Sequence, residues 1–286
     1  NHWTSYSVEQ TQFEVIATES GPVMGETLHL FMPIVKSCLQ TTREPQMRLK
    51  VFTMLSKLLL KASETVNSQG QLHSYSESFI NDMIVPNLKW QAGRTAGAIR
   101  TVAVSCLWVL LQSETLSQQE ILRVEDNLMP QVITTLEEDS KMCRLMSCRI
   151  IRALLSPCEG QLHPDKLNKI YPELLKRLDD ASDEVRVAAV KTLYQWFKCI
   201  NEEYERTTYK GHLEFLYKGL LVHLDDPDAS LQLIVLDLLK EASAVCPSLL
   251  LQEIELVRHK HRSPANCDQL FHYIQTYTSS PPTQCT

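Results

Sequence analysis

The sequence lacks several features that would place the protein in a membrane, outside the cell or on nucleic acid. Its 286 residues contain no Cys-x-x-Cys pair, no Asn-x-Ser/Thr sequon and no apolar run near the roughly 18–20 residues that span a bilayer. The 28 Lys and Arg are outnumbered by 34 Asp and Glu, and a formal net charge of −6 argues against sequence-independent nucleic-acid binding. Because the 9 cysteines are an odd number and sit mostly in apolar patterns, we expect a reducing, intracellular compartment.

Recognisable reaction chemistry is also missing. Residues 93–97 contain two glycines but lack the Lys-Ser/Thr of a phosphate loop, and no strand precedes them, so we interpret them as a helix-entry turn. The His- and Cys-containing stretch 259–272 follows no zinc spacing. The aspartates of 225–228 lack the Gly and Glu of a calcium loop and are better explained as helix caps. We predict no catalysis, no metal, no cofactor and no small-molecule substrate.

What the sequence contains is clearest at residues 169–200, KIYPELLKRLDDASDEVRVAAVKTLYQWFKCI. Apolar residues recur every three or four positions on both sides of an acidic turn at 179–183, which is typical of two amphipathic helices. The turn is rich in Asp and Ser, whose side chains cap helix N-termini. Neither helix could bury its apolar stripe alone, so the pair needs neighbours.

The same arrangement recurs and predicts a single array over residues 1–286. The predicted helix pairs occupy about 25–64, 76–113, 117–155, 165–200, 209–244 and 247–277. We expect a partial repeat at 1–20, an interior loop at 67–76 and a flexible tail at 278–286. Because the opening residues resemble the second helix of a repeat, the chain is expected to be a piece of a longer array.

Two residue types repeat in a fixed frame. Proline occurs late in four first helices, at Pro33, Pro86, Pro130 and Pro172. An arginine follows 14 or 15 residues later each time, at Arg48, Arg100, Arg144 and Arg186. Successive arginines are 52, 44 and 42 residues apart, close to the period of about 40–47 residues of HEAT and armadillo repeats. With no room for a third helix per unit, the pattern predicts an all-α, right-handed alpha-alpha superhelix, a HEAT-repeat solenoid. The recurrent proline predicts a bend in each first helix.

The recurring arginines are interpreted as structural. Together with Asp183 of the acidic turn, Arg48, Arg100, Arg144 and Arg186 are expected to form a ladder between neighbouring repeats. Because only the fourth unit has both members, the ladder is expected to be partial.

Charge differs between the two helices of a pair. Summed over five helix pairs, the second helices carry more Lys and Arg than Asp and Glu, although the fifth does not, and the first helices together show the reverse. Because second helices line the concave face of such solenoids, this difference predicts a weakly basic groove that receives an acidic protein segment. The groove would contain Lys57, Lys61, Arg149, Arg152, Lys191 and Lys198. The alternative that these are ordinary solvated side chains stays open.

Three tryptophans fall on or near predicted apolar stripes. They are Trp90, Trp108 and Trp196. Core packing is the expectation for each.

A resemblance adds a function to this architecture. Residues 253–270, EIELVRHKHRSPANCDQL, together with residues 171–186, resemble the C-terminal half of the HEAT-repeat dynein axonemal assembly factors, and the likeness extends over essentially the whole chain. The resemblance implies a non-catalytic cytoplasmic scaffold that preassembles outer and inner dynein arms for motile cilia, including within dynein assembly condensates of ciliated cells. The implied partners are dynein subunits, such as an intermediate chain, and chaperones or co-chaperones.

Two other non-enzymatic functions stay open. A cargo carrier of the importin type would be built from the same repeats and would bind GTP-loaded Ran. A regulatory subunit of a phosphatase or kinase complex would co-purify with enzymatic activity. An enzyme in its own right is the class that the sequence favours least.

Overall fold

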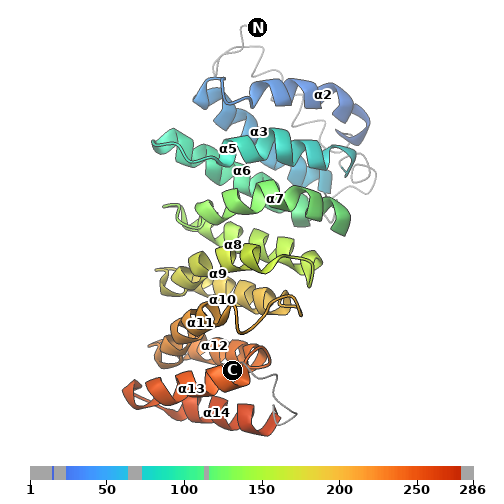
Figure 1. Ribbon diagram of the computed structural model, residues 1–286. Coiled ribbons are helices and arrows are strands. Elements are labelled where there is room, and N and C mark those ends of the chain that lie inside the picture. Colours follow the sequence, from blue (N-terminus) through green and yellow to red (C-terminus); the bar gives the residue numbers. More distant parts are fainter. Residues whose placement is uncertain (1–14, 16–23, 64–72, 113–115, 278–286) are drawn as a thin grey trace. The chain divides into compact units, whose positions relative to one another are not determined.

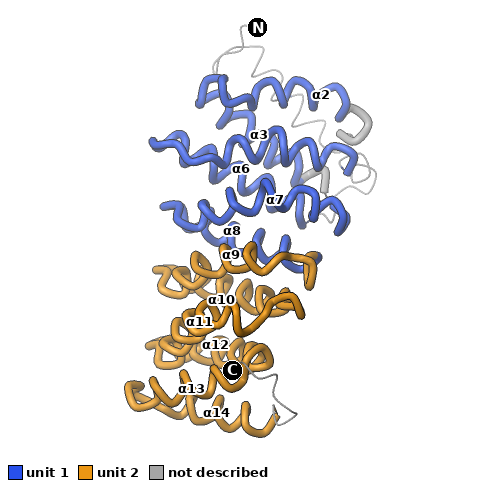
Figure 2. The backbone as a smooth tube through the Cα atoms, viewed as in Figure 1, with its two compact units in different colours: residues 1–157 blue, residues 158–286 orange. Residues whose placement is uncertain are grey.

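The computed structural model describes residues 24–63, 73–112 and 116–277, together with Val15. These residues form helices joined by turns, and no strand occurs among them (Figure 1). The all-α expectation is confirmed. Apart from Val15, the predicted partial repeat at 1–20 and the tail at 278–286 lie outside the described residues. The chain divides into two compact units, residues 1–157 (unit 1) and 158–286 (unit 2), as Figure 2 shows.

Unit 1 has two layers of helices. The first layer contains α2 (Met24–Cys38), a π-helix η2 (Phe79–Ile84) continued by α5 (Val85–Leu88), and α7 (Gln118–Thr135). The second layer contains α3 (Pro45–Ser63), α6 (Arg94–Gln112) and α8 (Lys141–Leu155). Within the second layer, α3 packs on α6 and α6 on α8, while α5 and η2 pack on α7. First helices therefore contact first helices, and second helices contact second helices.

Unit 2 repeats this arrangement. Its first layer contains α9 (Pro164–Lys176), α11 (Lys210–Val222) and α13 (Pro247–Val257). Its second layer contains α10 (Asp183–Lys198), α12 (Ala229–Ala242) and α14 (Ala265–Tyr277). Short 3-10 turns, η4 (Arg177–Asp179) and η5 (His223–Asp225), end the first helices of two repeats. Packing runs α9–α11–α13 in one layer and α10–α12–α14 in the other.

The recurring prolines lie within or beside first helices, as the frame predicts. Pro33, Pro130 and Pro172 are inside α2, α7 and α9. Pro86 instead follows the π-helix η2. A proline has no N–H for the carbonyl four residues back, and the wider π turn is one way for a helix to accommodate that loss. The predicted loop at 67–76 is wrong at its end, because residues 73–76 are already helical.

The tryptophans fall into three environments. Trp196 is fully buried in unit 2, donates its indole N–H to the Leu167 carbonyl at 2.8 Å, and packs edge-on against Tyr171. Trp108 on α6 is half-buried. The core prediction for Trp90 is wrong: its side chain is 71% exposed, because α5 ends at Leu88 and the chain turns extended before Trp90 is reached.

One glycine permits a close approach in unit 2. Gly219 of α11 faces Leu175 of α9, and a Cβ at position 219 would lie 2.5 Å from the Leu175 Cδ2 atom. That distance is far shorter than van der Waals contact, so Leu175 fits there because Gly219 has no side chain.

Helix α6 is long and apolar enough, by length and composition, to cross a membrane. It is also the middle helix of the second layer of unit 1, packed against α3 on one side and α8 on the other. Its buried residues, such as Ile99, Val104 and Leu107, are those of a core helix. We therefore attribute its apolar composition to packing.

Candidate functional site

The described residues contain no group of three or more His, Cys, Asp or Glu side chains that could hold a metal ion. Their polar contacts concentrate instead at the turns between the helices of a repeat.

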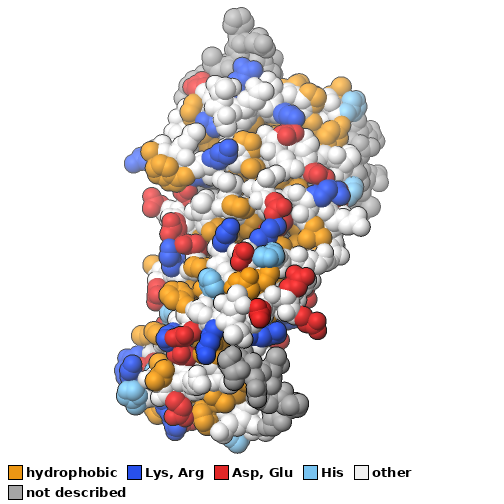
Figure 3. Space-filling view, in the orientation of Figure 1, with side chains coloured by type: hydrophobic (Ala, Val, Ile, Leu, Met, Phe, Trp, Pro, Cys, Tyr) orange, Lys and Arg blue, Asp and Glu red, His pale blue; other side chains and the backbone are white. Residues whose placement is uncertain are grey.

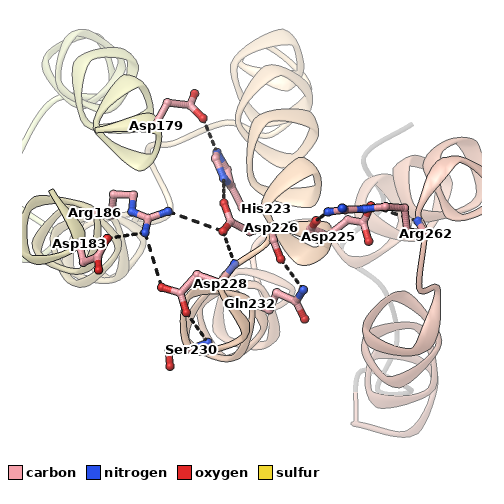
Figure 4. Close-up of polar contacts among 10 residues, drawn as sticks. All are labelled: Asp179, Asp183, Arg186, His223, Asp225, Asp226, Asp228, Ser230, Gln232 and Arg262. Carbon is pink, nitrogen blue, oxygen red and sulfur yellow. Dashed lines mark hydrogen bonds and ion pairs between the residues drawn. The ribbon is translucent and has the colours of Figure 1, made fainter. Parts of the chain in front are cut away.

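Arg186 is the centre of the polar contacts of unit 2 (Figure 4). Its Nη2 atom lies 2.5 Å from Oδ1 of Asp183, at the start of the same helix α10. The guanidinium also reaches the turn of the next repeat, 3.6 Å from Oδ1 of Asp226 and 3.6 Å from Oδ2 of Asp228. The hydrogen bond with Asp183, followed by the charges of Asp183, Asp226 and Asp228, raises the pKa of Arg186 above its ordinary value. One cation thus joins two successive repeats.

The aspartates of this turn are already occupied. Oδ1 of Asp226 accepts from the Asp228 N–H at 2.8 Å, and Oδ1 of Asp228 accepts from the Ser230 N–H at 2.8 Å. Asp228 is therefore the N-cap of α12. Gln232 adds a hydrogen bond from Nε2 to the Asp226 carbonyl at 2.5 Å. This geometry is that of a cap and an Asx turn, as the interpretation of residues 225–228 expected.

His223 connects the same turn to the preceding repeat. Only 7% of its side chain is exposed. Its Nδ1 atom lies 3.5 Å from Oδ2 of Asp226, and its Nε2 atom lies 3.9 Å from Oδ1 of Asp179 (Figure 4). The imidazole consequently bridges the end of η4 and the turn that follows η5.

A second set of hydrogen bonds links the turn between α11 and α12 to the last repeat. Oδ2 of Asp225 accepts from the Arg262 backbone N–H at 3.0 Å and from its Nε at 3.2 Å. The Asp225 carbonyl accepts from Arg262 Nη2 at 2.7 Å. These bonds, the backbone one above all, hold the pKa of Asp225 below its ordinary value. Gln232 occupies the position equivalent to the recurring arginine, and its Oε1 accepts from Asn266 at 3.0 Å.

In unit 1 two of the recurring arginines also contact the following repeat. Nη1 of Arg48 donates to Oδ1 of Asn87 at 2.8 Å. Arg100 pairs with the carboxylate of Glu138 and donates to the Gln91 carbonyl at 2.8 Å. Both arginines are 5% exposed, so these bonds satisfy buried donors, although Nε of Arg48 finds no hydrogen-bond partner among the described residues.

Arg144 departs from that pattern. Its Nη1 atom donates to the Glu138 carbonyl at 2.9 Å and to the Asp139 carbonyl at 2.8 Å, both in the turn before its own helix. The frame of the arginines thus fixes their place at the start of the second helix, but their partners vary. Among the described residues, Arg48 contacts the Asn87 amide and Arg100 contacts the Glu138 carboxylate, so neither repeats the Arg186–Asp183 pair.

A groove of about 1020 Å³ lies beside the exposed Trp90 in unit 1. Its walls are residues 90–102, which lead into and form the first turns of α6, and residues 134–140, at the end of α7 and the turn after it. Gly93, at φ 108°, is left-handed and directly precedes α6, which confirms the helix-entry turn. The sequence did not reveal this groove because Trp90 was expected in the core.

The predicted basic residues of unit 1 lie on two helices. Lys57 of α3 and Arg149 and Arg152 of α8 are exposed. Lys61 belongs to α3 as well, but its side chain lies outside the described residues.

The predicted basic residues of unit 2 lie on α10. Lys191 and Lys198 are both exposed, and the Lys198 ammonium sits 4.9 Å from the centre of the Tyr194 ring. The second layer to which they belong also carries acidic residues on each of its helices.

Solved structures with the same kind of fold support the architecture. The archaeal HEAT-like repeats protein from Thermococcus onnurineus NA1 aligns with 96% of this chain and 98% of its own, at a TM-score of 0.52 and 13% identity. A designed armadillo repeat protein aligns with 85% of this chain and 99% of its own, at a TM-score of 0.52 and 15% identity. These likenesses show the fold alone, and they confirm the repeat class.

Sequence relatives are much closer. The HEAT repeat family model matches residues 170–200, the helix pair singled out from the sequence. Dynein axonemal assembly factor 5 of Xenopus laevis is 91% identical over the whole chain, which covers 34% of that protein. The Homo sapiens protein of the same name is 53% identical over 96% of the chain, which covers 32% of it. The chain thus spans about a third of the length of the curated relatives it matches. It is a HEAT-repeat array homologous to that third of the proteins named dynein axonemal assembly factor 5.

Proposed function

We propose that this chain is a non-catalytic scaffold segment that acts in the preassembly of axonemal dynein arms, outer and inner, for motile cilia. It would do so in the cytoplasm, by binding dynein subunits such as an intermediate chain together with chaperones or co-chaperones. The observation that carries the proposal is the 91% identity, over the full chain, to a protein named as a dynein axonemal assembly factor.

The described structure is compatible with a binding role. Two layers of helices in each unit expose long helical faces, and polar side chains at the turns are occupied in joining repeats. Surfaces of this kind bind extended or partly folded polypeptides in repeat proteins. Partners, location and the assembly step itself are proposals that rest on the relatives.

The test removes this segment from the full-length assembly factor in multiciliated cells. One arm deletes residues equivalent to 24–277, and the control arm restores them. We expect the deletion to abolish co-precipitation of the dynein intermediate chain and to leave axonemes without outer and inner arms. Normal arms in the deleted cells would overturn the proposal.

The same precipitates distinguish the other two functions. Bound GTP-loaded Ran would indicate a cargo carrier of the importin type, and co-purified phosphatase or kinase activity would indicate a regulatory subunit. Either finding, without dynein subunits in the precipitate, would replace the proposed function.

A further inference from the structure

The three described second-layer helices of unit 1, α3, α6 and α8, contain no carboxylate side chain. Helices α3, α6 and α8 carry four, two and four Lys or Arg residues, ten in all, and no Asp or Glu. These helices are direct neighbours in the order α3, α6, α8. The corresponding layer of unit 2, built from α10, α12 and α14, carries four Lys or Arg and five Asp or Glu. Uncompensated positive charge therefore gathers on one layer of one unit.

Part of that charge is directed outward. Arg48, Arg100 and Arg144 are used in the hydrogen bonds described above, but Lys57, Arg149 and Arg152 are exposed. None of these last three forms an ion pair with any of the described residues. Arg149 and Arg152 are three residues apart on α8, so they lie on the same face of the helix.

Apolar side chains lie on the same three helices. Leu60 of α3 is 54% exposed and Met142 of α8 is 49% exposed, and Trp108 of α6, the helix between them, is half-buried. We call the surface formed by Lys57, Leu60, Trp108, Met142, Arg149 and Arg152 the acid-free face. In the view of Figure 3, acidic and basic side chains are interspersed.

The Trp90 groove adjoins this face. Ala98, Thr101 and Val102 of α6 line the groove, and they are partly exposed residues that precede Trp108 on the same helix. The groove is not part of the acid-free face, because Glu137, Glu138 and Asp139 also line it.

The composition of the acid-free face selects the chemistry of its ligand. Cations without carboxylates favour an anionic partner, because long-range attraction is not cancelled locally. The exposed Leu60 and Met142 and the half-buried Trp108 on the same three helices favour a ligand that also has apolar groups. A nucleic-acid backbone would satisfy the cations alone, and the chain as a whole has a net charge of −6.

We propose that the acid-free face binds an acidic segment of a partner protein, whose carboxylates contact Lys57, Arg149 and Arg152 and whose apolar side chains pack on Trp108 and Met142. Of the six basic residues predicted from the sequence to line a groove, this proposal keeps three, all in unit 1. The inference rests on the proposed function only for the partner being a protein of dynein assembly; the position of the face does not depend on it.

The experiment measures binding of a fluorescein-labelled peptide of repeating Glu-Glu-Leu units to the full chain, by fluorescence anisotropy at low and high salt. The test variant is K57E/R149E/R152E, and a second, milder variant is K57Q/R149Q/R152Q. The control K169E/K191E/K260E reverses three exposed lysines of unit 2 and changes the net charge equally. Circular dichroism verifies that each variant is folded. A poly-dT oligonucleotide is the competing anion.

We expect the test variant to weaken peptide binding by about tenfold or more, the Gln variant less, and the control by less than about twofold. The oligonucleotide should bind more weakly than the peptide. Equal losses in test and control variants, or unchanged binding in both test variants, would overturn the proposal. Tighter binding of the oligonucleotide through the same three residues would reassign the face to nucleic acid and overturn it as well.

The outcome is independent of the dynein experiment. Peptide binding that needs the three cations, in a protein that fails to precipitate dynein subunits, would leave the acid-free face in place and remove the proposed function. Dynein binding that survives K57E/R149E/R152E would leave the proposed function in place and remove the acid-free face as the dynein-binding surface.

Discussion

Units 1 and 2 place their charged residues differently on the same repeat architecture. In unit 2 Arg186 and Arg262 form ion pairs with aspartates of neighbouring turns, so these opposite charges neutralise each other between repeats. In unit 1 Arg100 pairs with the Glu138 carboxylate, but Arg48 and Arg144 bind an amide oxygen and backbone carbonyls. Further cations remain exposed on the second layer of unit 1. Both units use ion pairs to join repeats, but in unit 1 helices α3, α6 and α8 also carry cations that no carboxylate on the same helices balances. Four predictions, in order of decreasing effect, test this difference.

The largest effect is expected from the core of unit 2. Trp196→Ala removes a fully buried indole and the partner of the Leu167 carbonyl, and should cost about 3–5 kcal/mol of unfolding free energy. The matched change in unit 1, Trp108→Ala, removes a half-buried side chain and should cost less than about 2 kcal/mol. Amide hydrogen exchange of α9 and α10, compared with that of α6 and α8, measures both. Equal losses would mean that the two environments do not differ as described.

The ladder should matter more in unit 2 than in unit 1. Arg186→Ala leaves Asp226, whose side chain is 12% exposed, facing other carboxylates without its cation, and should cost about 2 kcal/mol. Arg144→Ala removes hydrogen bonds to two carbonyls of its own turn and should cost about 1 kcal/mol. Urea unfolding followed by exchange at the two turns gives the ranking. A greater loss from Arg144→Ala would contradict the proposed division of roles.

Two carboxylates of unit 2 should respond to pH with opposite sign. The Arg262 contacts lower the folded-state pKa of Asp225, so its stabilisation is present at neutral pH and is lost as pH falls through that pKa. Burial raises the folded-state pKa of Glu253, which is 4% exposed, so stability is lost as pH rises through its titration. Asp225→Asn should therefore destabilise at neutral pH, and the deficit should shrink in acid.

Glu253→Gln serves as the counterpart in the same thermal unfolding series. Relative to wild type it should be more favourable at neutral pH than in acid, because the variant avoids burying an ionised carboxylate. Parallel pH profiles for the two variants would show that contacts with Arg262 and burial do not separate these sites.

The smallest effect on stability is expected at Trp90. Trp90→Ala should change the unfolding free energy by no more than about 0.5 kcal/mol, because the side chain is 71% exposed. It should nevertheless remove an acrylamide-quenched, solvent-exposed part of the tryptophan emission. A loss of stability comparable with that of Trp108→Ala would place Trp90 in the core after all.

Much of the fold followed from periodicity. The proline and arginine frames located the helix pairs, since both depend on positions within one repeat. The frame could not tell that Arg144 binds its own turn, because a guanidinium reaches carbonyls of either repeat and the choice depends on the path of the turn. Nor could it place Trp90, which lies two residues beyond the end of α5.

The candidate face was only partly visible in the sequence. The excess of cations on second helices can be counted directly, but the restriction to unit 1 requires knowing that α3, α6 and α8 are neighbours. The exposed apolar residues Leu60 and Met142 were unpredictable, because an amphipathic stripe does not reveal which of its edges a neighbouring helix leaves open.

At Gly219 the absence of a side chain affects the spacing of two helices. The distance between α9 and α11 at Leu175 depends on one methyl group that position 219 does not have. With alanine at position 219, the Leu175 side chain would have to change rotamer for α9 and α11 to keep their present spacing. Gly219 forms no attractive side-chain contact of its own, yet its missing side chain allows the first helices of these two repeats to pack closely.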